Sequence, residues 1–183
     1  LVTNGEFSTN TNGWTQSGPT VATANGHNGN AAIFNANNTA AGGSISQVLD
    51  TKPGVLYSLS LEGAVSANVQ THVFRVELID SNGTVLATQD KTLNSLTVQT
   101  VAFDFTAASS STTIRITNTS VSNTTDSDML IDNVSVTPKF ITPNNSLVAG
   151  TTPPATANAD AALAYAGGTL DALSGNDTIT VTS

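Results

Sequence analysis

The chain has 183 residues and a net charge of −8, with 5 Lys and Arg residues against 13 Asp and Glu residues. So few cations cannot form the basic stripe that binds nucleic acid or an anionic membrane surface, and we expect neither partner. The absence of cysteine excludes disulfides and thiol chemistry, and no apolar run of about 18 residues predicts a membrane span.

Apolar and polar residues alternate in several segments, as half-buried antiparallel strands require. The expected inward-facing residues are Tyr57, Leu59 and Leu61, then Phe74, Val76 and Leu78, then Val101, Phe103 and Phe105, and finally Ile114 and Ile116. Pro53-Gly54 marks a turn before the first of these strands, and Asp80-Ser81-Asn82-Gly83 predicts a hairpin. Short strands with this spacing predict an all-β sandwich, with Trp14 in its core.

The composition changes after Pro138. Residues 139–158 are rich in Pro, Thr and Ala, which is typical of a linker or an extended strap. Residues 159–183 form a tail in which 160–166 is compatible with a short helix and 178–181 with a strand. We therefore predict a first domain over 1–138 and an extended C-terminal tail.

The order of motifs in the first domain resembles the jelly-roll sandwich of carbohydrate-binding modules, the galactose-binding-like fold. Asn4-Gly5-Glu6-Phe7 and Gly13-Trp14 open the pattern, and Ile131-Asp132-Asn133-Val134 closes it. Members of this group often hold a structural calcium ion where the first and last strands meet, and Asp132 matches that site. The resemblance implies a fold, whereas one fold carries many functions.

The residues themselves agree with a cation near Asp132. Asp132 has the same strand parity as Val134 and Val136, so we expect its carboxylate to point toward the core. A buried carboxylate requires a cation or several hydrogen-bond donors, and calcium prefers oxygen ligands. The predicted calcium ligands are Asp132, Asn4, Glu6 and Asn28. The alternative is that Asp132 accepts backbone N–H groups as a turn anchor. Ser8 stands where the family has an acidic residue, a departure from its pattern.

The tail resembles another family. The segment 169–179 is similar to one unit of the repeats-in-toxin β-roll, with Ala172-Leu173 in place of its glycine pair. This resemblance implies tail calcium ligands at Asp171 and Asp177 and points to bacterial secreted adhesins and surface-layer proteins.

Residues with catalytic potential are sparse. Neither His27 nor His72 has metal-ligand spacing to a second histidine, and each is interpreted as a surface residue. No nucleophile motif or paired carboxylates stand out, so we predict no enzymatic activity. The candidate residues for a polar glycan-binding face are Gln70, His72, Arg75, Glu77 and Arg115. Pairing of Glu77 with Arg75 or Arg115 across strands is the simpler interpretation.

These features lead to two functional hypotheses. The first is a secreted, non-catalytic bacterial subunit of a cell-surface layer, filament or adhesin, stabilised by calcium. Its partners would be copies of itself or other surface proteins bound through the tail. The alternative is a calcium-containing carbohydrate-binding module of a larger adhesin or secreted enzyme. Both place the protein outside the cell, which agrees with a processed N-terminus at Leu1.

Overall fold

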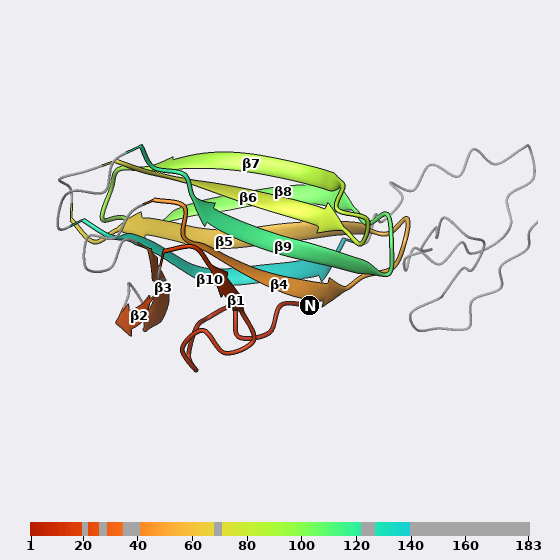
Figure 1. Cartoon of the computed structure of the whole chain (residues 1–183), viewed down its shortest axis with the longest axis horizontal. Helices are drawn as coiled ribbons and strands as arrows, with labels where there is room; N and C mark the ends of the chain where they lie inside the picture. The colour runs from red at the N-terminus through yellow and green to blue at the C-terminus, as the bar shows by residue number, and fades with distance from the viewer. Residues whose placement is uncertain (20–21, 26–28, 35–40, 68–70, 122–126, 140–183) are drawn as a thin grey trace, which may run out of the picture. The chain divides into compact units, whose positions relative to one another are not determined.

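The computed structural model describes residues 1–19, 22–25, 29–34, 41–67, 71–121 and 127–139 (Figure 1). The chain divides into two units, Leu1–Pro138 and Lys139–Ser183, and every described residue except Lys139 belongs to the first. The predicted repeats-in-toxin unit with Asp171 and Asp177, like the tail helix and strand, lies outside the described residues.

The first unit is an all-β sandwich of two antiparallel sheets, as the sequence predicts (Figure 1). One five-stranded sheet has the order β1-β4-β9-β6-β7 and the other has the order β2-β3-β10-β5-β8. The strands are β1 (Thr15–Ser17), β2 (Ala22–Asn25), β3 (Asn30–Phe34), β4 (Ser44–Asp50), β5 (Leu56–Val65), β6 (His72–Asp80), β7 (Val85–Leu93), β8 (Gln99–Thr106), β9 (Ser111–Asn118) and β10 (Met129–Pro138). The two sheets are called the β9 sheet and the β10 sheet below, after their central strands.

The core lies between the two sheets and follows the predicted alternation. Its strand residues include Tyr57, Leu59 and Leu61 of β5, Phe74, Val76 and Leu78 of β6, Val101 and Phe105 of β8, and Ile114 and Ile116 of β9. Phe103 is only partly buried and packs against this cluster. Trp14 is 7% exposed and stacks on Phe7 with ring centroids 5.6 Å apart, so its predicted place in the core is confirmed.

The predicted turns join these strands. The side chain of Asp80 accepts hydrogen bonds from the amides of Asn82 and Thr84, each at 2.8 Å, and closes the hairpin between β6 and β7. Gly83 has a φ of 85° in that turn, a conformation that glycine adopts without steric cost. No helix of the length and hydropathy needed to cross a membrane occurs in the part of the chain described.

Candidate functional site

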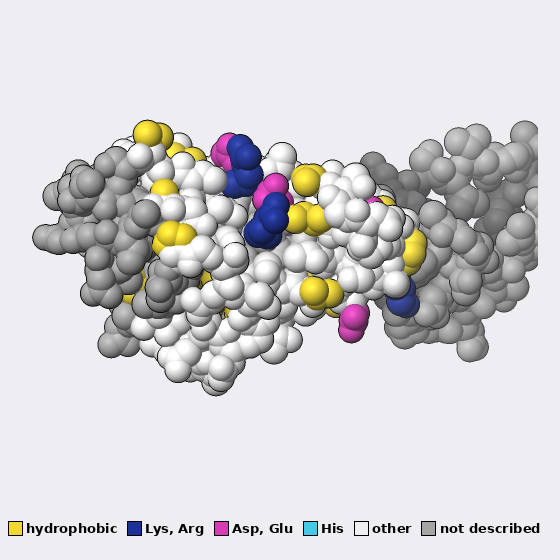
Figure 2. Space-filling view, in the orientation of Figure 1, with side chains coloured by type: hydrophobic (Ala, Val, Ile, Leu, Met, Phe, Trp, Pro, Cys, Tyr) yellow, Lys and Arg dark blue, Asp and Glu magenta, His cyan; other side chains and the backbone are white. Residues whose placement is uncertain are grey.

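Three of the predicted glycan-face residues lie together on the outer surface of the β9 sheet. Alternation along β6 sends Phe74 and Val76 into the core, so Arg75 and Glu77 point outward. Glu77 stands directly opposite Arg115 of β9, and Arg75 stands opposite Thr117. The sheet register therefore brings Arg75, Glu77 and Arg115 onto one surface, which Figure 2 shows as pairs of basic and acidic groups among uncharged atoms.

Two ion pairs fix the cationic groups on this surface. Nε of Arg115 donates to Oε2 of Glu77 at 2.9 Å, and its Nη2 lies 2.8 Å from the same oxygen. Arg75 donates through Nε and Nη2 to the two carboxylate oxygens of Asp90 on β7, at 2.7 and 2.8 Å. The guanidinium of Arg75 holds the pKa of Asp90 below its usual value. Of the two arginines predicted as partners of Glu77, the structure therefore pairs Arg115 with it, while Arg75 pairs with Asp90.

Hydroxyl side chains surround these charges. Ser46 of β4 stands opposite Arg115, and Thr88 of β7 stands opposite Glu77, so both share the outward parity of the ion pairs. We call this polar part of the outer surface the β9 face; its members are Ser46, Arg75, Glu77, Thr88, Asp90, Arg115 and Thr117. Such a surface offers hydrogen-bond donors and acceptors side by side.

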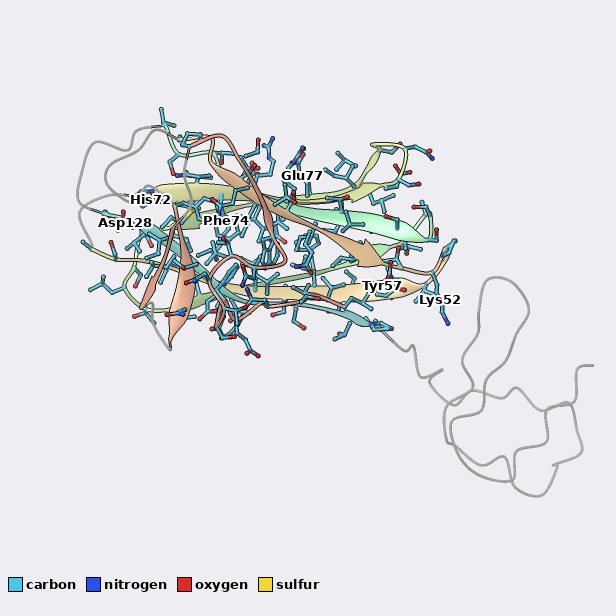
Figure 3. All side chains as sticks on the ribbon, turned by 60° about the horizontal axis from the view of Figure 1, so that its bottom comes forward. Lys52, Tyr57, His72, Phe74, Glu77 and Asp128 are labelled. Atoms are coloured by element: carbon cyan, nitrogen blue, oxygen red, sulfur yellow. The ribbon has the colours of Figure 1, made fainter. Side chains whose placement is uncertain are left out.

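His72 does not belong to the β9 face. It has the inward parity of Phe74 and is fully buried, which corrects its interpretation as a surface residue (Figure 3). Its Nδ1 lies 3.3 Å from Oγ of Ser120, and its Nε2 has no hydrogen-bond partner among the described residues. Burial lowers the pKa of His72, against smaller opposing effects of the Ser127 backbone and Asp128. Gln70 and Asn28 lie outside the described residues.

The described aromatic rings offer no platform on which a sugar ring could stack. Trp14 and Tyr57 are buried, as are the rings of Phe7, Phe34, Phe74 and Phe105. Phe103 is the partly buried ring of this part of the chain, and it packs against the core. A ligand on the β9 face would therefore be held by hydrogen bonds.

Asp132 does not point into the core, contrary to the prediction. The register of β10 against β5 shifts between Asp132 and Ser135, and Asn133 adopts a φ of 50°. This β-bulge adds one residue, so Ile131 and Val134 both face inward while Asp132 faces outward and is half-buried. The amide of Asn133 donates to Oδ1 of Asp132 at 2.7 Å, which is the turn-anchor alternative.

Asn4, another predicted calcium ligand near the bulge, already uses its side chain in hydrogen bonds within the N-terminal loop. Oδ1 of Asn4 accepts from the amide of Thr9 at 3.2 Å, while its Nδ2 donates to the carbonyls of Asn10 and Asn12, each at 2.8 Å. Within the described residues, no three His, Cys, Asp or Glu side chains gather in a way that could hold a metal ion. Calcium also binds amide and backbone oxygens, so the calcium site stays a prediction.

The structure also shows a carboxylate pair that the sequence pattern did not single out. Asp132 stands directly opposite Glu62 of β5, on the outer surface of the β10 sheet. The pKa of Asp132 is raised, first by burial and then by the charges of Glu62 and Glu6, despite the hydrogen bond from Asn133. The adjoining depression, lined by both acids and by Leu130, holds only about 10 Å³. Small-molecule pockets usually enclose about 300–1,000 Å³, so this pair has no room for a sugar.

A sequence model of one family, described as "Protein of unknown function (DUF642)", matches residues 2–137. The chain belongs to this family. A search of curated proteins gives no match.

Solved structures with the same fold include several carbohydrate-binding modules. A family 61 module in complex with β-1,4-galactotriose has a TM-score of 0.59 and 12% identity, over 75% of this chain and 97% of that one. A family 16 module has a TM-score of 0.57 and 18% identity, over 75% and 99%. The family 22 and catalytic modules of a Clostridium thermocellum xylanase, complexed with xylohexaose, give a TM-score of 0.56 and 19% identity, over 73% and 28%. At these identities the similarity shows the β-sandwich fold of this DUF642 chain, and the fold alone.

Proposed function

We propose that the DUF642 domain is a non-catalytic carbohydrate-binding module that holds a neutral polysaccharide on its β9 face. The observation that carries the proposal is that Arg75 and Arg115 are each held by a carboxylate and lie next to the hydroxyl groups of the β9 face. The Glu77 side chain is only 15% exposed, whereas that of Arg115 is 43% exposed, so a largely buried carboxylate fixes a guanidinium that reaches solvent. Fixed planar donors of this kind can bind neighbouring hydroxyl groups of a sugar with little loss of side-chain entropy.

Charge favours a neutral ligand over an acidic one. Both arginines of the β9 face are already paired with a carboxylate, and the chain carries a net charge of −8. A polyanion would meet repulsion from the molecule as a whole. Without a described aromatic platform, about four or five net hydrogen bonds of about 1 kcal/mol each correspond to a Kd of roughly 1 mM.

Polysaccharide retention tests the proposal. Affinity electrophoresis in gels that contain xylan, galactan, mannan or soluble cellulose derivatives would show retardation by at least one neutral polymer. The Arg115→Ala and Arg75→Ala variants are expected to lose most of it, while Lys52→Ala, in the turn before β5, serves as a matched loss of one cation. Migration unaffected by every polymer, or equal retention in all variants, would contradict the proposal.

The assembly hypothesis rests on a different part of the chain. The filament, surface-layer or adhesin role depends on association through the tail, which lies outside the described residues, so it stays a prediction. An extracellular location would suit a polysaccharide-binding module, and it belongs to the same proposal. The described part of the chain favours the carbohydrate-binding alternative because its surface carries the groups that such binding needs.

A further inference from the structure

A second hollow lies away from the β9 face, between the N-terminal loop and the bulge in β10. It encloses about 560 Å³, and its polar lining comes from Asn4, Glu6, Ser8, Thr9, Asn133 and Ser135. Glu6, Ser8, Asn133 and Ser135 are exposed, so their side chains are accessible from solvent. This volume falls within the range of about 300–1,000 Å³ that is typical of small-molecule sites.

The walls of the hollow are held rigidly by close backbone contacts. The amide of Val134 donates to the carbonyl of Gly5 at 3.0 Å, because the bulge turns this amide away from the ladder. A Cβ atom at Gly5 would overlap the carbonyl oxygen of Val134, so the loop lies directly on β10 at this point. One wall is thus fixed to the other by the bulge.

Unusual backbone conformations shape the loop. Asn4, Phe7 and Asn133 have φ values of 52°, 50° and 50°, and this region is costly for a bulky residue such as Phe7. Burial of the Phe7 ring against Trp14 compensates for this cost, and Nε1 of Trp14 donates to the carbonyl of Asn4 at 3.1 Å. Strain maintained by surrounding contacts in this way is concentrated at binding sites.

The chemistry of the lining selects the ligand. Glu6 is the only carboxylate among the residues that line the hollow, and the other polar side chains are neutral amides and hydroxyls. The amino group of Leu1, which also lines the hollow, donates to the carbonyl of Val136 at 2.7 Å. A calcium ion needs six to eight oxygen ligands at about 2.4 Å, which calls for a much smaller cage. A carboxylate can accept hydrogen bonds from two neighbouring hydroxyl groups, and Ser and Thr side chains can both donate and accept.

We propose that this hollow binds a single neutral sugar unit, such as the end of a glycan chain, with Glu6 accepting from two of its hydroxyl groups. The Ser8 and Ser135 hydroxyls, from the loop and from β10, hold the ring between the two walls. The site is separate from the β9 face, because β10 belongs to the other sheet. The domain would then bind the length of a polysaccharide on the β9 face and the terminal sugar of a glycan in the hollow.

Titration of the isotope-labelled full chain with neutral monosaccharides, followed by amide NMR shifts, tests this proposal. The probes are glucose, galactose, mannose, xylose, arabinose and fucose, each added in buffer with EDTA. At least one sugar is expected to shift the amides of Glu6, Ser8 and Ser135 while those of Arg75 and Arg115 stay in place. The Glu6→Gln variant is expected to weaken this binding about tenfold, since it loses a charged acceptor. Asp50→Asn, an exposed acid on β4, is the matched control.

A second variant, on the other wall of the hollow, tests the proposal even if Glu6→Gln alters the conformation of the N-terminal loop. Ser135→Phe places a ring into the hollow from β10 and is expected to abolish the shifts while the remaining spectrum is preserved. Shifts with no sugar, or shifts that appear only with calcium and disappear with EDTA, would overturn the proposal. Arg115→Ala separates the two sites: it is expected to lose polysaccharide retention and keep the monosaccharide shifts, so either proposal can fail alone.

Discussion

The left-handed backbone of Asn133 lies in the β10 bulge, where the strand has one extra residue, and it determines which way the neighbouring side chains point. Asn tolerates this conformation better than most residues. The bulge turns Asp132 outward and frees the amide of Val134 to bond Gly5. The sequence contains a signal for it: Met129 and Ile131 have one parity, and Val134 and Val136 have the other. A parity argument that starts only from Val134 misses this change.

At the residue scale, we predict that Asp132→Asn stabilises the protein in the absence of calcium. The variant removes a charge that stands opposite Glu62, and its side-chain oxygen can still accept the amide of Asn133. The pKa of Asp132 is raised in the folded state, so folding disfavours its ionised form. The free energy of unfolding therefore falls as the pH rises from the ordinary carboxyl pKa toward the raised pKa. The expected gain at neutral pH is a few tenths of a kcal/mol in urea unfolding, scaled to one like-charge pair.

The same variant tests the calcium prediction. If Asp132 is a calcium ligand, added calcium raises the Tm of the wild-type protein, EDTA reverses the rise, and Asp132→Asn loses it. If Tm does not respond to calcium or EDTA, the predicted site is wrong. Asp50→Asn, an exposed acid on β4 of the other sheet, is the control for the loss of one carboxylate elsewhere.

At the element scale, β4 is joined to the N-terminal loop by one buried side chain. Oε1 of Gln47 accepts from the amide of Thr3 at 2.7 Å, and its Nε2 donates to the carbonyls of Thr3 and Gly13, each at 2.9 Å. We predict that Gln47→Leu costs about 2 kcal/mol in unfolding free energy, since these backbone groups lose their partner and water replaces it only in part. Hydrogen exchange is expected to accelerate at Thr3 and over residues 4–14. Gln89→Leu on the edge strand β7 is the control, and equal protection in both variants would show that Gln47 does not hold the loop.

The first residue of β6 gives the fold a pH dependence. Burial lowers the pKa of His72 below its ordinary 6.5, so the folded state binds its proton less readily than the unfolded state. Its contribution to stability is therefore complete above pH 6.5 and is lost as the pH falls below that value. We predict that the unfolding free energy falls by up to about 1.4 kcal/mol per pH unit there. This slope is expected to be absent in His72→Gln, and an unchanged slope in that variant would refute the assignment.

Regular alternation explains what could be predicted from the sequence. In β5, β6, β8 and β9, side chains simply take turns between the core and solvent, so the inward residues and the outward Arg75, Glu77 and Arg115 follow from their spacing. The same alternation also applies to His72, which lies two residues before Phe74 in β6 and therefore faces inward with it. The carboxylate pair of Glu62 and Asp132 and the hollow beside the bulge depend on which strands become neighbours and on one irregular residue. Local periodicity carries no information on either.

At the scale of the whole molecule, the two functional hypotheses depend on different parts of the chain. The proposed glycan surfaces lie within the unit Leu1–Pro138, whereas the predicted self-association depends on the tail within Lys139–Ser183. The sandwich buries its own core and has no Cys to pair with the tail, so it has the means to fold without it.

We therefore predict that a chain ending at Lys139 keeps the Tm of the full chain to within about 2 °C, a shift below about 1 kcal/mol for a domain of this size. It is also expected to keep its retention by polysaccharide. Sedimentation of both forms, with calcium present, then isolates the role of the tail. Association of the full chain but not of the shortened chain would support a surface-assembly role in addition to glycan binding. Monomers in both cases, with retention intact, would remove the assembly hypothesis and leave the carbohydrate-binding module.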